Sequence, residues 1–387
     1  GPLRAVEKRE FGFGVAGKLR IRHKAFPSLS TLTDFVRSLL PSDAYHSAAF
    51  YARPDAEIMK GKDWQAAELI FDIDCDHIPT PCKKTHDKWQ CLNCSNEGPG
   101  KAPEKCVRCG KSKFKEEGWV CSDCLGAAKK EALKLISILK EDLNIAPSEM
   151  NVVFSGHRGY HIHMDNEEIN KLDAVERKEI VDYVTASGIN LTFHGSIPKK
   201  HQTWGPSGDM PGWSGRLAKV FYSLLHMSEE EWRNRDIPDI IQRRLSEKRA
   251  ELLKAGPSED MWRILGRMPE VTFRKTMEKI PPWVAAAIDT VVTTDIHRLI
   301  RLPNTLHGKT ALRVAPVNID RLESFDPFTE AVAFTMEETV KVTTRNSPTV
   351  VFNGRVYGPF AEGEVYNLPL AVSIFLLCRG RAILTNG

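Results

Sequence analysis

The sequence predicts a mixed α/β fold in which an α/β core carries a zinc-binding insertion and a helical insertion. Short β-branched runs occur along the chain between longer segments of helical periodicity. Three Cys-x-x-Cys pairs fall between residues 91 and 124, a lysine-rich region with few apolar residues. A strongly charged segment at about 205–280 has tryptophans and leucines at helical spacing.

The expected elements follow from these periodicities. Strands are expected at 19–26, 68–74, 151–164, 289–293 and 311–317, and helices at 30–40, 126–144, 167–187, 217–227, 229–255 and 258–280. The Gly/Pro-rich loop at 202–215 marks the start of the helical insertion. The predicted domains are the core at 4–81, 126–204 and 281–387, the zinc-binding insertion at 82–125 and the helical insertion at 205–280.

Two carboxylates one residue apart are the most informative feature of the chain. Asp72 and Asp74 end the apolar run that begins at Leu69. Alternate side chains of a strand point to the same face, so the two acids would project together. Like charges that close need a cation, and Mg²⁺ or Mn²⁺ bound by carboxylates and substrate phosphates is the usual solution. The ordinary alternative is a strand end with solvated acids.

A glycine-containing turn follows the strand expected from residue 151. A hydroxyl, a guanidinium and an imidazole surround its two glycines, and these groups suit phosphate oxygens. The candidate phosphate ligands are Ser155, Arg158 and His161. His163, taken alone, is better explained as a packing or surface histidine.

A third acid and a basic loop lie nearer the C-terminus. Asp289 opens a β-branched run, and two arginines, a histidine and a lysine follow between 298 and 309. An acid followed by a base-rich loop is what a metal and triphosphate site requires. We interpret Asp295, in the same stretch, as the N-cap of a helix.

Together these segments resemble the catalytic small subunit of archaeal and eukaryotic DNA primases. The matching segments occur in the family's order from about residue 8 to 380: they are 9–13, 20–22, 69–74, 155–161, 289–309 and 325–328. The resemblance implies a mixed-sheet, archaeo-eukaryotic primase-like catalytic core. It also implies synthesis of short primers on single-stranded DNA by two-metal nucleotidyl transfer.

The resemblance further implies a role for each matching residue. The metal-binding acids would be Asp72, Asp74 and Asp289, the last at the family's spacing upstream of its Leu-His-x-Lys element. The nucleotide-binding residues would be Ser155, His157, Arg158, His161, Arg301, His307, Glu10 and Arg22. His157 is a departure, because the family often has a second arginine at that position.

The cysteines predict two nested structural zinc sites. Paired Cys-x₂-Cys knuckles are typical of tetrahedral zinc, and a region this poor in apolar residues needs a metal to organise it. The first site would use Cys82, His86, Cys121 and Cys124, and the second Cys91, Cys94, Cys106 and Cys109. Cys75 is an alternative to Cys82. The family usually has one such zinc, so the second site is interpreted as an insertion.

Other cysteine arrangements are weaker. A disulfide framework fits poorly, because nothing indicates secretion and such spacing in an intracellular chain favours metal. Cys378 lies in an apolar run and is expected to be a buried thiol.

Composition is consistent with an intracellular enzyme that does not enter a membrane. Net charge is only +4, from 54 Lys+Arg and 50 Asp+Glu, so nucleic-acid binding must come from local patches. The longest apolar run, 368–378, is about half a membrane span and predicts a buried C-terminal element. The expected location is the cytoplasm or nucleoid in an archaeon and the nucleus in a eukaryote. The resemblance implies nucleoside triphosphates, a DNA template and a large subunit with an iron–sulfur cluster as partners.

Two alternatives remain open at this point. A primer-extending repair polymerase of the same superfamily would share the acids and the glycine-containing turn. A non-catalytic, zinc-dependent nucleic-acid-binding module would leave the three separated acids unexplained.

Overall fold

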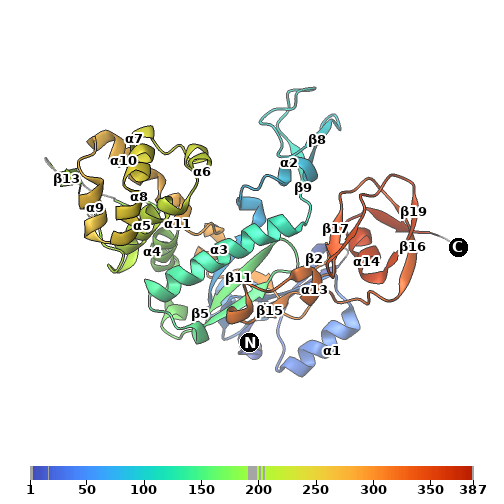
Figure 1. Ribbon diagram of the computed structural model, residues 1–387. Coiled ribbons are helices and arrows are strands. Elements are labelled where there is room, and N and C mark those ends of the chain that lie inside the picture. Colours follow the sequence, from blue (N-terminus) through green and yellow to red (C-terminus); the bar gives the residue numbers. More distant parts are fainter. Residues whose placement is uncertain (1–2, 16, 191–197, 200–201, 204, 386–387) are drawn as a thin grey trace. The chain divides into compact units, whose positions relative to one another are not determined.

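The computed structural model describes residues 3–385 apart from 16, 191–197, 200–201 and 204 (Figure 1). The chain divides into two compact units. We call them the sheet unit, residues 1–133, 147–178 and 287–387, and the helical unit, residues 134–146 and 179–286. The segment predicted as a zinc-binding insertion lies in the sheet unit, and the segment predicted as a helical insertion lies in the helical unit.

Two four-stranded antiparallel sheets form the centre of the sheet unit. The first has the order β14-β3-β1-β2, with β14 (Leu299–Arg301), β3 (Asp43–Ser47), β1 (Phe11–Val15) and β2 (Lys18–Lys24). The second has the order β15-β10-β11-β6, with β15 (Ala315–Val317), β10 (Met150–Phe154), β11 (Gly159–Met164) and β6 (Leu69–Asp74). A separate pair consists of β4 (Ala49–Tyr51) and β5 (Trp64–Ala67).

Strand β11 is buried along its whole length, because β10 and β6 flank it on both sides. Its ladder with β6 pairs His161 with Asp72 and Gly159 with Asp74. An apolar cluster of Ala48, Ile70, Val292 and Ile300 packs residues from both sheets together. The acids predicted at 72 and 74 therefore lie on a central, rigidly paired part of the fold.

The segment after Asp289 is a helix, so the strand expected at 289–293 is wrong. Residues Thr290–Thr294 form α12, and the Asp289 carboxylate caps it by accepting a hydrogen bond from the Val291 amide at 3.0 Å. The N-cap assigned to Asp295 is wrong for the same reason, because Asp295 stands at the C-terminal end of α12. The cap and the packing of Val292 outweigh the strand propensity of this β-branched run.

The other expected helices are present with shifted or broken boundaries. In the sheet unit and at its borders they are α1 (Leu29–Leu39), α3 (Ser122–Glu141) and α4 (Ala174–Val184). The single helix expected at 229–255 is three helices, α6 (Glu229–Asn234), α7 (Asp239–Glu247) and α8 (Arg249–Ala255). Asp236 takes a positive φ of 50° and Pro238 precedes α7, which ends the first helix and starts the next.

The helical unit is built around buried aromatic residues. Its remaining elements are the short strands β12 (Pro198–Lys199) and β13 (Gln202–Thr203) and the helices α5 (Gly212–Ser223), α9 (Glu259–Leu265), α10 (Glu270–Lys279) and α11 (Pro281–Val284). Trp232 and Trp262 are each 1% exposed and donate their indole N–H groups to the carbonyls of Leu224 and Pro206, both at 2.8 Å. The apolar spacing in 205–280 thus produces a separate core.

The C-terminal part of the sheet unit carries a further small sheet and a buried helix. The sheet has the order β19-β16-β20, with β19 (Val365–Pro369), β16 (Thr339–Thr344) and β20 (Ala382–Leu384), and a hairpin of β17 (Val350–Phe352) and β18 (Arg355–Tyr357) lies beside α13 (Pro327–Glu330). The apolar run at 368–378 forms α14 (Leu370–Cys378), whose first residues are mostly buried. Cys378 itself is exposed, so its assignment as a buried thiol is wrong. Among the described helices, none has the length and apolarity needed to span a membrane.

A buried ion pair connects the two main sheets. Arg9, just before β1, is fully buried and pairs with the carboxylate of Glu68, just before β6. Arg9 also donates to the Ser47 carbonyl at 2.6 Å, and the other Glu68 oxygen lies 3.1 Å from His163 Nδ1. His163 is therefore a packing histidine, as expected. A buried pair of this kind is costly to break from one side.

We expect Glu68→Leu or Arg9→Leu alone to lower the free energy of unfolding by about 3–5 kcal/mol, because each leaves an unpaired buried charge. The double variant should lose clearly less free energy of unfolding than the sum of the two single losses. Urea denaturation measures this, with Arg233→Leu in an exposed pair as a control that changes stability by about 0.5 kcal/mol or less. Single losses below about 1 kcal/mol would show that the pair does not hold the sheets together.

Candidate metal and nucleotide site

Three acids meet at the end of strand β6. Asp72 and Asp74 alternate along the strand, and the Asp289 amide donates to the Asp72 carbonyl at 2.8 Å. Asp74 accepts a hydrogen bond from the Asp76 amide at 2.8 Å. The structure thus brings together the two strand acids and the third acid that the sequence places more than two hundred residues away.

The electrostatics of these acids favour a cation. Burial, then the charges of Asp74 and Asp289, raise the pKa of Asp72 to about 7. Burial, then Asp76, also raise the pKa of Asp74. His161 Nε2 lies 3.6 Å from Asp72 Oδ1, but burial lowers the pKa of His161 far below its ordinary value, so the ring is neutral. Arg298 near Asp72 and Arg158 near Asp74 oppose these shifts without reversing them, so the carboxylates remain a suitable ligand set for Mg²⁺ or Mn²⁺.

Two glycines make the turn between β10 and β11 possible. Gly156 has a φ of 79°, and a Cβ there would lie 2.8 Å from the Cβ of His307. A Cβ at Gly159 would lie 2.0 Å from the Ile73 carbonyl oxygen, which only glycine avoids. Ser155 Oγ accepts from the Gly159 amide at 3.2 Å and so closes the turn.

The basic loop predicted at 298–309 lies against this turn. Thr310 donates its hydroxyl to the Gly156 carbonyl. The rings of His157 and His307 are stacked, with centroids 4.9 Å apart and an interplanar angle of 10°. Burial lowers the pKa of His157 well below its ordinary value and that of His307 to about 3, so both rings are neutral. Charge for binding phosphate must come from other residues of the turn and the loop.

The predicted arginines are already paired with carboxylates. Arg158 is 1% exposed, with Nη1 3.1 Å from Asp76 Oδ1 and Nη2 3.4 Å from Asp87 Oδ2. Gly118 covers its guanidinium so closely that a Cβ there would lie 1.4 Å from Nη1. Arg301 pairs with Asp43 and lies over the Tyr45 ring. Both arginines therefore border the turn while engaged in ion pairs.

Glu10 and Arg22 form a cluster of their own on the other sheet. Arg22 Nε donates to Glu10 Oε1 at 2.9 Å, and Lys62 Nζ lies 3.3 Å from Glu10 Oε2. Although burial opposes it, Arg22 and Lys62 hold the pKa of Glu10 below its usual value. Among the contacts of the described residues, none connects this cluster directly to the three acids.

The two predicted cysteine clusters assemble as sets of four ligand atoms. In the first, His86 Nε2 lies 3.2 Å from Cys121 Sγ and 3.6 Å from Cys124 Sγ, and Cys82 Sγ lies 3.5 Å from Cys124 Sγ. Ligand atoms about 2.3 Å from a tetrahedral metal would be about 3.8 Å apart, so these separations fit zinc. Cys75 does not belong to the four-ligand group.

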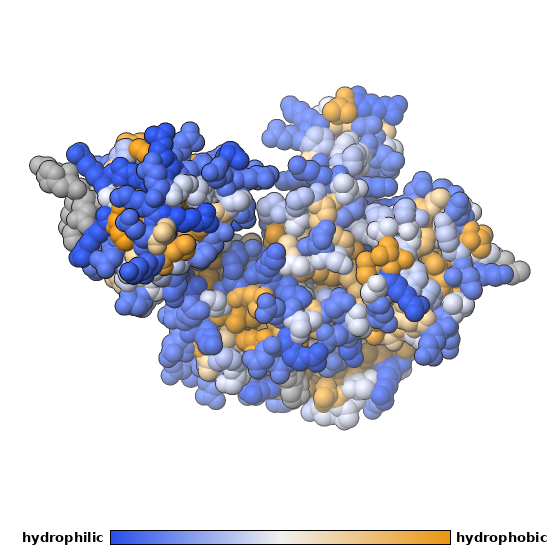
Figure 2. All heavy atoms as spheres, in the orientation of Figure 1, coloured by the Kyte–Doolittle hydropathy of each residue, from blue (hydrophilic) through white to orange (hydrophobic). Residues whose placement is uncertain are grey.

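The second cluster lies in a small ribbon. The ribbon has the strand order β8-β7-β9, with β7 (Lys88–Cys91), β8 (Glu97–Pro99) and β9 (Phe114–Glu117), and follows the short helix α2 (Lys83–His86). Cys91 lies 3.6 Å from Cys109, and Cys94 lies 3.6 Å from Cys106. The face of the ribbon seen in Figure 2 is mostly hydrophilic, and Leu92 and Val107 are exposed; the buried Trp89 packs against Phe114, with ring centroids 5.4 Å apart. The ribbon therefore has little apolar core, and a metal is the evident stabilising element.

In the part of the chain that the structure describes, only these two clusters hold three or more metal-ligating atoms within 4.8 Å of one another. The three acids are more widely spaced.

Asp87 connects the first cluster to the turn. Its Oδ1 lies 2.7 Å from His86 Nδ1 and accepts from the Trp119 amide at 2.8 Å, and its Oδ2 faces Arg158. A carboxylate behind a metal-ligating histidine fixes the orientation of the ring. Asp87 is not among the site residues predicted from the sequence, although its position next to the predicted ligand His86 was a signal.

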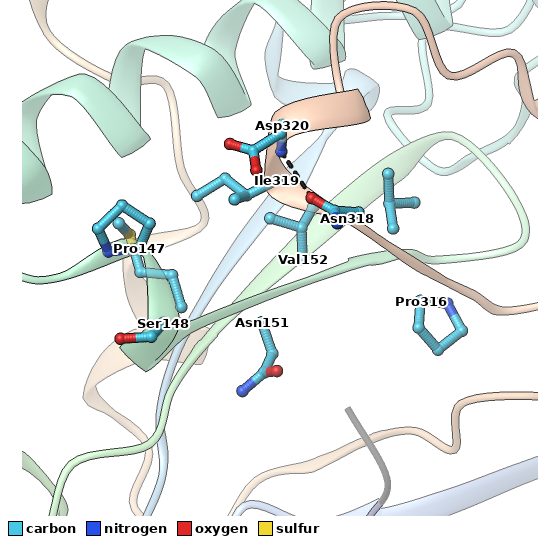
Figure 3. Close-up of a pocket in the computed structure, with 10 residues that line it drawn as sticks. Pro147, Ser148, Asn151, Val152, Pro316, Asn318, Ile319 and Asp320 are labelled. Carbon is cyan, nitrogen blue, oxygen red and sulfur yellow. Dashed lines mark hydrogen bonds between the residues drawn. The ribbon is translucent and has the colours of Figure 1, made fainter.

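A separate hollow of about 520 Å³ lies at the start of β10, at the opposite end of that strand from the Ser155 turn (Figure 3). Asn151 and Val152 of β10 line it together with Asn318 and Asp320, which follow β15. The Asp320 amide donates to Asn318 Oδ1 at 2.9 Å. None of the predicted site residues lines this hollow, and it contributes nothing to the chemistry of the acids.

Comparison with known proteins relates the chain to one family. The model of the DNA primase small subunit family matches residues 115–319. Relatives named DNA primase small subunit PriS occur in Cenarchaeum symbiosum, Methanococcoides burtonii and Methanothrix thermoacetophila, each 32% identical to this chain. The alignments cover 98%, 93% and 97% of this chain and 92%, 87% and 92% of the relatives.

The raised pKa of Asp72 predicts a stability that depends on pH. In the folded chain the Asp72 carboxyl keeps its proton to about pH 7, whereas the ordinary pKa of an aspartate is 3.8. The stabilising contribution is therefore complete below about pH 4 and is lost as pH rises through about 7, by on the order of 4 kcal/mol at most. In buffer without Mg²⁺ or Mn²⁺, Asp72→Asn should not show this loss. Its free energy of unfolding, measured by urea denaturation, should rise relative to that of the wild type between about pH 5 and about pH 8. Parallel curves for the two proteins would contradict the assignment.

Proposed function

The chain belongs to the DNA primase small subunit family and is an enzyme that synthesises primers, and on this premise we propose that Asp72, Asp74 and Asp289 hold its catalytic metal ions. One observation carries the proposal. The register between β6 and β11 puts Asp72 opposite His161 and Asp74 opposite Gly159, directly beside the phosphate-suited turn. Mg²⁺ or Mn²⁺ held there supplies activation of the attacking 3′-hydroxyl and neutralises charge on the departing pyrophosphate.

The chain's own residues would bind and orient the nucleotide. Ser155, His161, Arg301 and His307, with His157 and Arg158 at the turn, would hold the triphosphate so that the α-phosphorus faces the primer end. His307 Nδ1 accepts from the Lys309 amide at 3.1 Å, so a neutral ring carries its proton on Nε2 and can donate it to a phosphate oxygen. Glu10 and Arg22 are proposed to act near the incoming nucleotide from the neighbouring sheet.

We propose that both cysteine clusters bind structural zinc. The set Cys82, His86, Cys121 and Cys124 would fix the segment next to the turn, and Cys91, Cys94, Cys106 and Cys109 would fold the ribbon. The ligand separations and the lack of an apolar core in the ribbon support this.

The proposed partners follow from the family. They are single-stranded DNA as template, nucleoside triphosphates, and a primase large subunit with which the chain forms a heterodimer. Because the compared relatives are archaeal, the proposed place of action is the cytoplasm and nucleoid.

We expect the wild-type chain to make short products on unprimed single-stranded DNA with Mg²⁺ or Mn²⁺. Asp72→Asn/Asp74→Asn should lower the rate at least about 100-fold, because metal ligation supplies several kcal/mol of charge stabilisation. Asp320→Asn, an exposed acid outside the site, is the matched control and should retain full activity.

Other outcomes of that assay would select the alternatives. Extension of added primers without new primers would favour a repair polymerase, or a subunit that needs its partner to begin synthesis. Equal activity of the wild type and the double variant would refute the metal site.

Native mass spectrometry should find two zinc ions on each wild-type chain and one on Cys106→Ser/Cys109→Ser. The variant's ribbon should become sensitive to protease, because its metal is its main source of order. Cys378→Ser, outside both clusters, should retain two ions. A wild type that binds one ion with an intact ribbon would disprove the second site.

A further inference from the structure

Most buried arginines near the site have a carboxylate partner. Arg9 pairs with Glu68, Arg158 with Asp76 and Asp87, and Arg301 with Asp43. Arg379, which ends α14, differs from them. Among the residues that the structure describes, no carboxylate oxygen lies within the 4 Å of an ion pair from its guanidinium, although the side chain is partly buried. A partly desolvated charge that makes no direct ion pair is a natural site for an anionic ligand.

Neutral groups hold the Arg379 guanidinium at the turn. Nη2 donates to the Gly118 carbonyl, and Nη1 lies 3.2 Å from His157 Nε2. The guanidinium carbon lies 5.3 Å from the centroid of the Trp119 ring. Nε is buried and has no hydrogen-bond partner among the described residues. Arg379 therefore reaches the Ser155 turn from the C-terminal helix.

The contact with Arg379 also sets the proton position on His157. A guanidinium can only donate, so His157 Nε2 must accept, and the proton of the neutral ring then stands on Nδ1. His307 stacks on this ring and has its own proton on Nε2 for the corresponding reason. Two neutral imidazole donors and one unpaired cation thus gather at one side of the turn. That combination matches the oxygens of a polyphosphate.

The environment of Arg379 makes an anion more favourable still. Burial is the main cause that lowers the pKa of Arg379; the carboxylates of Glu117 and Asp87 oppose the shift, and the cations Arg158 and Arg381 add to it. The side chain stays charged at neutral pH, because the ordinary value for arginine is far above it. A bound phosphate would relieve both the burial penalty and the repulsion.

We propose that Arg379 is a further triphosphate-binding residue, which contacts the incoming nucleoside triphosphate beside His157 and His307. The proposal rests on the proposed nucleotide site and adds to it a cation from the C-terminal helix. Arg379 supplies to that side of the turn the charge that the two neutral histidines cannot supply.

The test is direct binding of inorganic tripolyphosphate and of ATP, with AMP as the comparison ligand, by isothermal titration calorimetry of the full chain. Arg379→Gln should weaken tripolyphosphate and ATP binding about 10- to 100-fold, the effect of one charge-assisted hydrogen bond, and should leave AMP binding within about twofold. Arg379→Lys keeps the positive charge but cannot form the paired hydrogen bonds of a guanidinium. Its affinity for tripolyphosphate and ATP should lie between those of the wild type and Arg379→Gln. In primer extension, Arg379→Gln should raise KM for the nucleotide by a larger factor than it lowers kcat.

Arg381→Gln is the matched control. Arg381 is two residues away and pairs with Glu117 at 2.9 Å, so its loss should leave triphosphate binding unchanged. Equal losses in both variants would mean a diffuse field effect and overturn the contact. Retention of ATP affinity in Arg379→Gln would overturn the proposal, and a lowered melting temperature in that variant would then show that Arg379 only clamps Gly118 and Trp119. If Arg379→Gln does not fold, full wild-type ATP affinity in Arg379→Lys would overturn the proposal. A wild type that binds no tripolyphosphate would instead refute the nucleotide site itself.

Discussion

The close approach of β11 to β6 at Gly159 is the constraint on which the site depends. Any side chain at that position would collide with the Ile73 carbonyl, so the turn after Ser155 can close and the ladder can form only with glycine there. The ladder fixes the alternation that points Asp72 and Asp74 to one face, and a slip of one residue would turn both acids away. Asp289 joins through a backbone hydrogen bond to the same strand. The same register therefore positions both the proposed metal-binding acids and the turn proposed to bind phosphate.

Carboxylates, more than free cations, organise the positive side of the site. Asp43 holds Arg301 and also accepts from the Gly308 amide at 3.0 Å, and Asp76 and Asp87 hold Arg158 beneath Gly118. Because Asp87 also contacts His86, one acid serves both a proposed zinc ligand and an arginine of the turn. Disturbance of the first cysteine cluster would therefore reach the turn through a single side chain, which would couple the proposed zinc to the proposed nucleotide site.

The site features that could be predicted from the sequence are those in which the key residues lie close together along the chain. The paired acids, the glycine-containing turn and the cysteine knuckles are each short motifs, and the structure brings their members together. Predictions failed where tertiary packing decided the outcome. The run after Asp289 is a capped helix, the charged segment from 229 is broken at Pro238, and Cys378 lies beyond the buried part of α14. Arg379 carried no sequence signal, because its partner His157 is 222 residues away.

The ribbon leaves the sheet unit and returns to it at one place. Cys82 and His86 precede it, Cys121 and Cys124 follow it, and all four meet in the first cluster. The two ends of the ribbon are thus held together whatever its length, and lengthening a closed loop adds little entropic cost. Evolution can consequently lengthen, shorten or replace the ribbon without moving the acids. A fluorescent or affinity module grafted at residues 101–105, between β8 and the Cys106/Cys109 pair, would report on this enzyme from outside its working parts.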